Sequence, residues 1–479
     1  MQPARSSHPT HSPAVRPNLL LVIADDLSAA NLACYGNPDS ATPNFDRFAA
    51  EGLRFNRAYT ACPQCMPARA ALLTGRSPVG MQMTRFNAPL PAEIPTFPEV
   101  LKARGYFTGA VGRDHHLDGD RNPASAPLFA ERALRTFSKR LDVVRRAENR
   151  NTEEIFEHFE AFLQQAPAEK PFFLQLNFFD PHRPFFPERI PSPRDPAALA
   201  LPSYYPPTAR VRRDLAHHYD AVNRLDADFG RLLARLDQTG LAANTIVVFT
   251  ADHGASQFRG KGTLFEPGIR IPLLIRWPGT TPRASVSDDL ISGEDLAPTL
   301  LEAAGAPPPP GSTGVSFLGR LLGESQFAGR DHLFSERGAH GSSLPNNTVN
   351  FDLSRTVVTH RYKLIYNALW QLPFAPVDFQ NSAMWKEIQT LNAQGALSAL
   401  HSRLYFSPTR PMFELFDVGN DPDELNNLAG CAATADIEAR LKQTLHEWMI
   451  LERDYVPLPI PRAPIKGLDE PEELVPGAA

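Results

Sequence analysis

The chain has 479 residues, with 53 acidic and 48 basic side chains and a formal net charge of -5. This balance excludes nucleic-acid binding through bulk positive charge, because neutralising phosphates requires a clear surplus of lysine and arginine. Hydrophobic residues make up 42% of the chain and charged residues 21%, as is typical of soluble globular proteins. No apolar run approaches the roughly 20 residues of a membrane-spanning helix, so we expect neither nucleic acid nor a membrane as a partner.

The two ends of the chain predict segments without regular structure. Residues 1–17 are rich in Pro, Ser and His and lack the apolar core of a signal peptide. We therefore expect a disordered N-terminal segment and a cytoplasmic protein; if a leader has been removed, the alternative is a periplasmic or secreted protein. Residues 457–479 are rich in Pro and Glu and predict a tail that is disordered or lies along the surface.

From Asn18 to Ala306, apolar strands alternate with amphipathic helices. In chain order, the predicted elements are a strand over 18–24, helices over 43–51 and from about 67, a helix over 96–104, a strand over 107–111, a helix over 152–165, a strand over 171–179, a helix over 208–238 and a strand over 244–250. This alternation predicts a parallel sheet that helices cover on both faces.

The pattern changes after Ala306. A run of prolines at 307–310 precedes the short strand-like segments 355–358, 362–366 and 413–418 and a closing helix over 436–452. Short strands with frequent turns predict an antiparallel sheet. We therefore expect an α/β fold in which a large, mostly parallel sheet flanked by helices (residues 18–330) precedes a smaller C-terminal α+β subdomain with an antiparallel sheet (residues 331–456).

Acidic residues directly follow two of the predicted strands. Asp25 and Asp26 come after the strand over 18–24, and Asp252 and His253 follow the strand over 244–250. The carboxyl ends of parallel strands meet at one edge of a sheet, so these side chains would converge. Three carboxylates and an imidazole are typical ligands of a hard divalent cation such as Ca2+ or Mg2+. For either pair alone, the alternative is a helix N-cap with a solvated neighbour.

A cysteine begins the helix predicted from about residue 67. Pro67 suits the first turn of that helix and Gly75 its end. Cys65 would then lie at the helix N-terminus, where unpaired N–H groups favour a thiolate or a bound anion. From the residues alone, Cys65 is either a nucleophile with a lowered pKa or an ordinary buried cysteine. Cys62 and Cys65 form a C-x-x-C pair, but the second pair of a zinc site is missing from the sequence.

The segment Cys65-Met-Pro-Ala-Arg69, followed by Leu73-Thr-Gly-Arg76, resembles the signature of the type I sulfatases in the alkaline phosphatase superfamily. In that family a formylglycine-generating enzyme oxidises the cysteine to formylglycine, so the resemblance implies this modification of Cys65. The family usually has serine where this chain has Ala68. The resemblance extends from about Asn18 to Leu451. Within the family, the segments 172–183 and 361–379 resemble members that cleave N-sulfoglucosamine.

The resemblance also implies roles for individual residues. It assigns the cation, usually Ca2+ with Mg2+ as an alternative, to Asp25, Asp26, Asp252, His253 and the residue formed from Cys65. It assigns catalysis to Cys65, Arg69, Arg113, His115, His182 and Lys261, and substrate binding to Lys261, His182 and Arg270. Arg113 stands where the family usually has lysine, and His115 has a histidine neighbour, His116, that could take its role.

The resulting prediction is a sulfatase that cleaves a sulfate ester or sulfamate. Its expected substrate is a sulfated saccharide such as N-sulfoglucosamine from heparan sulfate or heparin, and a homodimer is left open. One alternative is a phosphonate or phosphate monoester hydrolase, because phosphoryl and sulfuryl groups share their tetrahedral shape. Another is a non-catalytic binder of sulfated glycans in which Cys65 is unmodified. The pattern does not determine the exact substrate, which depends on loops such as 336–354 and 371–383.

Overall fold

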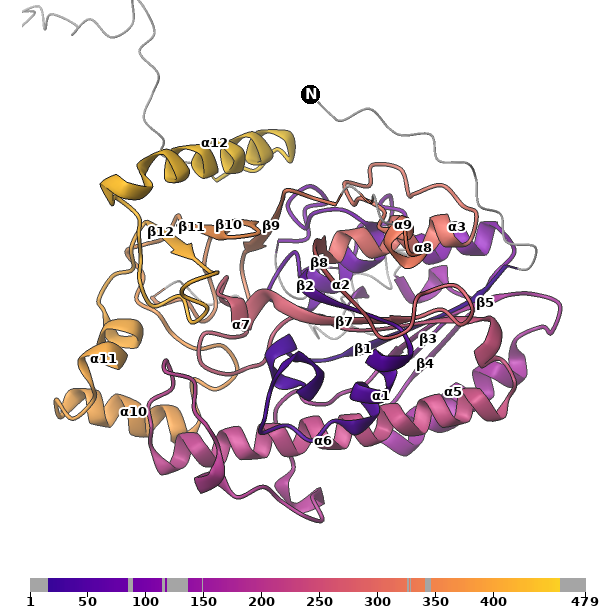
Figure 1. Ribbon diagram of the computed structural model, residues 1–479, viewed down its shortest axis with the longest axis horizontal. Helices are drawn as coiled ribbons and strands as arrows, with labels where there is room; N and C mark the ends of the chain where they lie inside the picture. Colours follow the sequence, from indigo (N-terminus) through magenta and orange to yellow (C-terminus); the bar gives the residue numbers. More distant parts are fainter. Residues whose placement is uncertain are drawn as a thin grey trace, which may run out of the picture.

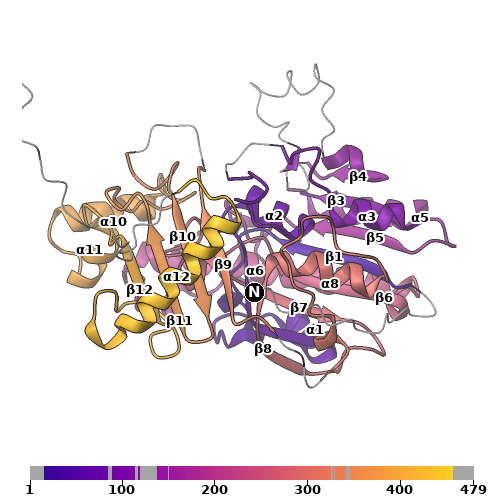
Figure 2. The same cartoon turned by 90° about the horizontal axis from the view of Figure 1, so that it is seen from above.

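The computed structural model describes residues 16–84, 89–113, 117–118, 137–148, 150–324, 327, 329–340 and 346–456. Apart from residues 16 and 17, the predicted disordered N-terminal segment and the predicted tail lie outside these residues. The described chain forms an eight-stranded sheet and a four-stranded sheet that lie side by side (Figures 1 and 2).

The large sheet is mixed but mostly parallel. Its strands are β1 (Asn18–Ala24), β2 (Leu53–Tyr59), β3 (Phe107–Gly112), β4 (Val143–Arg146), β5 (Phe172–Asn177), β6 (Thr245–Ala251), β7 (Arg270–Arg276) and β8 (Ser285–Ser292), in the spatial order β4-β3-β5-β1-β6-β7-β2-β8. Only β7, among these strands, runs antiparallel to its neighbours. Strands β1 and β6 are buried along their whole length, as continuous apolar runs require. The predicted fold class is confirmed.

Helices cover both faces of the large sheet. They are α1 (Pro43–Glu51), α2 (Cys65–Thr74), α3 (Phe97–Ala103), α5 (Thr152–Gln165), α6 (Ala209–Gln238), α7 (Glu266–Ile269), α8 (Leu296–Ala303) and α9 (Leu318–Leu321). Helices α1, α5 and α6 lie on one face, and α2, α3, α8 and α9 on the other (Figure 1). Within the part of the chain that the structure describes, no helix is both long and apolar enough to cross a membrane.

The smaller sheet is antiparallel, as predicted. It comprises β9 (His332–Arg337), β10 (Ser354–Thr359), β11 (Tyr362–Asn367) and β12 (Phe413–Asp417), in the order β12-β11-β10-β9. Helix α12 (Ala435–Leu451) packs Leu441 and Leu445 against one face of this sheet. Helices α10 (Ala383–Ala393) and α11 (Ala399–Phe406) instead pack against the first half of α6 through an aromatic cluster that includes Trp385 and Tyr405. The proposed domain boundary near residue 330 stays a prediction.

A buried carboxyl lies where the two sheets approach each other. Glu336 in β9 is 2% exposed, and its backbone N–H donates to the carbonyl oxygen of Ala61, 2.9 Å away, in the loop before α2. Burial raises the pKa of Glu336 from 4.5 to about 8, although the nearby Arg355 opposes this shift. The folded state therefore holds this proton more tightly than the unfolded chain does.

We predict that Glu336→Gln flattens the loss of stability between about pH 4.5 and pH 8. Because the pKa is raised in the folded state, the carboxyl contributes its full stabilisation below pH 4.5. This contribution to the free energy of unfolding is lost as the pH rises through about 8. The measurement is the free energy of unfolding in urea at several pH values. Glu447→Gln, at an exposed position of α12, serves as the control. Equal slopes for the wild type and Glu336→Gln would contradict the prediction.

Candidate active site

The register of the large sheet brings the predicted metal ligands together. Strands β1 and β6 pair in parallel with Ala24 opposite Ala251, so the residues that follow them, Asp25 and Asp252, leave the sheet at the same edge. The backbone N–H of Asp252 donates to the carbonyl oxygen of Ala24 at 3.2 Å. On the other side of β1, Ile23 pairs with Asn177 at the end of β5. The carboxyl edge of three neighbouring strands thus carries polar side chains into one place.

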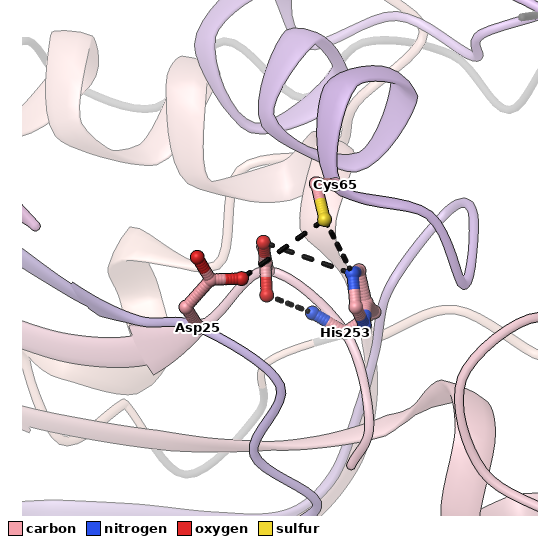
Figure 3. Close-up of side chains that lie close together, drawn as sticks. Asp25, Cys65 and His253 are labelled. Atoms are coloured by element: carbon pink, nitrogen blue, oxygen red, sulfur yellow. Dashed lines mark hydrogen bonds and ion pairs between the residues drawn. The ribbon is translucent and has the colours of Figure 1, made fainter. Parts of the chain in front are cut away.

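Asp25, Cys65, Asp252 and His253 form a compact buried cluster. Each offers one ligand atom, and these four atoms all lie within 4.8 Å of one another. Figure 3 shows Cys65 pointing from the start of α2 toward Asp25 and His253. Its Sγ lies 3.2 Å from His253 Nε2 and 4.0 Å from Asp25 Oδ1. The structure therefore places the predicted cysteine beside the predicted metal ligands.

Asp26 joins the same site in a strained conformation. Its φ is 67°, a left-handed value that is uncommon outside glycine and is found at functional sites. Its N–H donates to Asp252 Oδ1 at 3.2 Å. Among the described residues, its buried Oδ2 atom has no hydrogen-bond partner. Burial raises the pKa of Asp26 to about 6, against the opposing effect of Lys261 and His253, so a bound cation would keep the carboxylate ionised below that pH.

The orientation of His253 also suits a metal ion. Its Nδ1 atom lies 2.9 Å from the carbonyl oxygen of Gly254. A carbonyl oxygen can only accept, so Nδ1 carries the hydrogen, and the Nε2 atom faces Cys65 and Asp26. Metal-binding histidines are commonly fixed in this way by a backbone carbonyl. The donor set, three carboxylates and one imidazole, fits a divalent cation that prefers oxygen ligands.

Helix α2 positions Cys65 at its first residue. Gln64 is the N-cap, and Gly75 ends the helix in a left-handed conformation with φ of 67°, as predicted from the glycine. The helix N-terminus favours the thiolate of Cys65, but burial and the neighbouring carboxylates outweigh this effect. Burial, together with Asp25, Asp252 and Asp26, holds the pKa of the Cys65 thiol well above its usual value, although Lys261 opposes this. The environment therefore disfavours a thiolate, which argues against the alternative of a nucleophile with a lowered pKa.

Two of the predicted cationic residues neutralise the acidic cluster. Arg69 donates from Nε to Asp252 Oδ2 at 3.1 Å and from Nη1 to Asn177 Oδ1 at 2.8 Å, and its Nη2 lies 3.6 Å from Asp25 Oδ2. Arg113 forms an ion pair with Asp25. Asn177 was not predicted as a site residue. Its place at the end of β5, next to the strand that carries Asp25, is the only signal that could have indicated it.

Lys261 and His182 lie on the Asp26 side of the cluster. Lys261 Nζ is 2.9 Å from Asp26 Oδ1 and 2.6 Å from Asp378 Oδ2. Burial opposes its charge, but Asp26 and Asp378 raise the pKa of Lys261 well above its usual value. His182 Nε2 lies 3.9 Å from Asp26 Oδ2. Burial, and then the positive charges of Lys261 and Arg113, lower the pKa of His182 well below its usual value, so its ring is neutral.

Asp378 and His340 belong to this site but were not predicted as site residues. Asp378 Oδ2 lies 3.7 Å from His182 Nε2, and Asp378 Oδ1 lies 3.8 Å from His340 Nε2. Burial opposes ionisation of Asp378, but Lys261, His340 and His182 outweigh it and hold its pKa far below the usual value. Both residues lie in the two loops that the sequence indicated for specificity, 336–354 and 371–383. No local pattern distinguishes them within those loops.

Among the described residues, Arg270 is the predicted site residue that is not brought into this group. Arg270, at the start of β7, donates from Nε to the carbonyl oxygen of Asn56 at 2.8 Å, and among the described residues none of its contacts reaches the acidic cluster. The position of Arg270 on β7 directs its side chain toward β2. No contact among the described residues therefore supports the predicted role of Arg270 in substrate binding. His115 and its neighbour His116 lie outside the described residues, and the role predicted for His115 stays a prediction.

Comparison with known proteins identifies the family. The sequence matches the sulfatase family over residues 17–306 and the C-terminal region of N-sulphoglucosamine sulphohydrolase over residues 254–401. Because the first match covers more than half of the chain, the protein belongs to the sulfatase family, and it is a hydrolase. The resemblance to sulfatases and to N-sulfoglucosamine-cleaving members is confirmed.

The relatives are similar along most of their length. Human N-sulphoglucosamine sulphohydrolase is 29% identical over 470 residues, which cover 90% of this chain and 89% of that protein. Human arylsulfatase A is 32% identical over 61% of this chain and 65% of its own length. Among solved structures, a protein in complex with its substrate D-glucosamine-2-N,6-O-disulfate superimposes with a TM-score of 0.69 at 20% identity, over 92% of this chain and 99% of that chain.

A different activity occurs on the same fold. The phosphonate monoester hydrolase of Agrobacterium radiobacter superimposes with a TM-score of 0.66 at 20% identity, over 91% of this chain and 96% of that chain. At this level of identity the similarity shows the fold alone. The fold therefore does not by itself separate sulfate from phosphonate substrates.

We predict that Ca2+ stabilises the protein against heat. Ions at about 100 times their dissociation constant contribute about 2.7 kcal/mol when they bind only the folded state. The shift in thermal midpoint, relative to protein treated with a chelator, should be smaller at about pH 5 than at about pH 7.5. Below its pKa of about 6, Asp26 must first lose a proton to bind the ion.

The variant Asp252→Asn should lose most of the Ca2+-dependent shift. Asp289→Asn is a matched control, because Asp289 pairs with Arg320, outside the acidic cluster. A midpoint of the wild type that does not respond to Ca2+, or an unchanged response in Asp252→Asn, would show that the cluster does not hold the ion.

Proposed function

We propose that this sulfatase removes sulfate from a saccharide, with N-sulfoglucosamine as the leading candidate substrate. The observation that carries the proposal is the position of Cys65, at the start of α2 and 3.2 Å from His253 Nε2, among three buried carboxylates. The substrate class is supported by the similarity to human N-sulphoglucosamine sulphohydrolase over 90% of the chain. The match of residues 254–401 to the C-terminal region of that enzyme supports the same class.

The proposal includes two groups that the family uses. The hydrate of a formylglycine formed from Cys65 would supply a hydroxyl nucleophile. Burial raises the pKa of the Cys65 thiol and so disfavours thiolate chemistry in its place. A divalent cation bound by Asp25, Asp26, Asp252 and His253 would act as a Lewis acid toward a sulfate oxygen. The modification requires a formylglycine-generating enzyme as a partner.

The arginines hold the reacting groups in place. Arg69 reaches Asp252, Asp25 and Asn177 at once, so it fixes two metal ligands relative to the start of α2. Arg113 pairs with Asp25, and its side chain is 12% exposed. Fixed positive charges in a dry site stabilise the negative charge that develops on sulfate oxygens during transfer. In this role Arg113 replaces the lysine that is usual in the family.

Lys261 and His182 are placed to act on the leaving group. Lys261 is charged, because two carboxylates hold its proton, and it would attract the sulfate and the departing atom. In the tautomer in which Nδ1 accepts from Arg150 Nη2, 3.0 Å away, the neutral His182 would donate a hydrogen bond from Nε2 to the departing oxygen or nitrogen. Asp378, which contacts both residues, is more exposed than either: its side chain is 27% exposed, against 14% for His182 and 1% for Lys261. A substrate would therefore approach from the side of Asp378.

We predict turnover of N-sulfoglucosamine in preference to a phosphonate monoester. The experiment compares N-sulfoglucosamine, an aryl sulfate and a phosphonate monoester, with the Cys65→Ala variant as the inactive control. A phosphate monoester carries more negative charge than a sulfate, so the few cations of this site suit sulfate better than phosphate. A phosphonate monoester is a monoanion like a sulfate, so the preference over it rests on the similarity to N-sulphoglucosamine sulphohydrolase. Mass spectrometry of the peptide that contains residue 65 must show formylglycine in the active preparation.

The alternatives give different results in this experiment. Turnover of the phosphonate without turnover of either sulfate would assign the protein to phosphonate hydrolysis. A thiol that stays unmodified in the native host, together with binding but no turnover, would support the non-catalytic glycan binder. Turnover of the aryl sulfate alone would retain the sulfatase and exclude the N-sulfoglucosamine specificity.

We also predict that Asp378→Asn lowers kcat/KM for the sulfated substrate by about 10- to 100-fold, the usual effect of losing a residue that orients a catalytic group. Asp378 contacts Lys261, His182 and His340, so the substitution frees the lysine from one of its two carboxylates. The control is Gln371→Ala, an exposed position of the same loop. Unchanged kinetics in Asp378→Asn would remove Asp378 from the site.

A further inference from the structure

A second cavity lies behind the loop that carries Lys261. Its volume is about 400 Å³, which is in the range of small-molecule sites. It is enclosed by the loop 259–265, by strands β10 to β12 and by α11 with the residues that follow it. None of the predicted metal ligands lines it. Gly262 and Thr263 line it directly, so a single loop separates this cavity from the acidic cluster.

Two buried arginines in this cavity keep unused hydrogen-bond donors. Arg259 and Arg337 are 4% and 2% exposed. Among the described residues, the Nε atom of each has no hydrogen-bond partner. Arg259 donates from Nη2 to the carbonyl oxygen of Glu424 at 2.9 Å, and its guanidinium lies 3.5 Å from the centre of the Phe265 ring. Buried N–H groups without partners are unfavourable, and an anion in the cavity would stabilise the two guanidinium charges by electrostatic attraction.

The carboxylates of the cavity already have other partners. Asp352 receives two hydrogen bonds from Arg410, at 2.8 and 2.7 Å. Glu424 pairs with Lys363 at 2.7 Å. Glu414 accepts from Asn367 Nδ2 at 2.9 Å, and burial raises its pKa. Asp352 also lies 3.8 Å from Arg337 Nη1. The lining nevertheless holds four arginines against three acids, since Arg403 and Arg410 join Arg259 and Arg337, and the cavity therefore favours an anion.

The rest of the lining suits a ring-shaped molecule. The side chains of Phe265, Phe374, Tyr405 and Phe416 supply flat apolar surfaces, and Asn367 and Ser354 supply polar groups. At the rim, Arg403, Thr409 and Asn427 are exposed, so the cavity opens to solvent on the side of α11. A carboxylate or sulfate group would meet the arginines, while its ring would meet the aromatic side chains.

We propose that this cavity is a second binding site, separate from the acidic cluster, for an organic anion the size of one sugar ring. The loop between the two sites is held from both sides. Arg337 donates to the carbonyl oxygen of Gly262, and the N–H of Gly262 donates to the carbonyl oxygen of Pro63 at 3.0 Å. The neighbouring Lys261 reaches the acidic cluster. An anion bound near Arg337 would thus lie close to Gly262, the residue that follows Lys261 in the chain.

The experiment measures binding of glucuronate by isothermal titration calorimetry to the full-length protein, with glucose as the neutral probe and inorganic sulfate as the anion without a ring. We expect glucuronate to bind at one site, and glucose to bind at least about tenfold more weakly. Thr409→Trp, which fills the rim, should weaken glucuronate binding by at least about tenfold. Gln394→Trp, at an exposed position outside the cavity lining, is the matched control and should bind as the wild type does.

A further variant separates the two anion sites. Lys261→Met removes a cation from the acidic cluster, so glucuronate binding should persist in it. Loss of binding in Lys261→Met with normal binding in Thr409→Trp would place the anion at the acidic cluster and overturn the proposal. Absence of glucuronate binding to the wild type, or equal binding of glucose, would overturn it as well. If inorganic sulfate binds as tightly as glucuronate, the cavity is an anion site, but it does not select for a sugar ring. Because binding is read directly, these outcomes do not depend on which sulfated substrate the enzyme cleaves.

Discussion

The central constraint of this structure is the electrostatic cost of burying three carboxylates together. Asp25, Asp26 and Asp252 are at most 1% exposed, and like charges in a medium of low polarity repel strongly. The fold balances them with Arg69 and Lys261, which are equally buried, and with Arg113. The raised pKa of Asp26 shows that this balance is incomplete. A bound divalent cation would complete it.

The position of the site follows from the way the two sheets meet. The carboxyl edge of the large sheet supplies the acidic cluster, and the loops of the smaller sheet supply Asp378 and His340. Lys261 joins the two halves, because its ammonium contacts a carboxylate from each. The proposed metal ligands thus follow the ends of parallel strands, whereas Asp378 and His340 come from loops. This division allows one fold to act on different substrates.

The sequence was informative wherever a local pattern decides the structure. Continuous apolar runs indicated β1, β5 and β6, and the residues Thr152–Gln165 formed the predicted helix α5. Strands β2 and β8 were missed, because polar residues such as Arg54 and Asp288 interrupt their apolar residues near the edge of the sheet. Strand β7 was also missed: its direction depends on the return of the chain after β6, and the local composition does not determine such a return.

By itself, the sequence determined which chemical groups stand at the ends of the central strands and at the start of α2. Apolar runs show where strands end, and a motif within a few residues does not depend on the rest of the chain. Only the tertiary structure decided that Asp378 contacts Lys261, that Asn177 receives a hydrogen bond from Arg69, and that Arg270 turns away. These contacts depend on strand register and on loops that are distant in the chain. Their geometry is set by the packing of the whole protein, which no local pattern encodes.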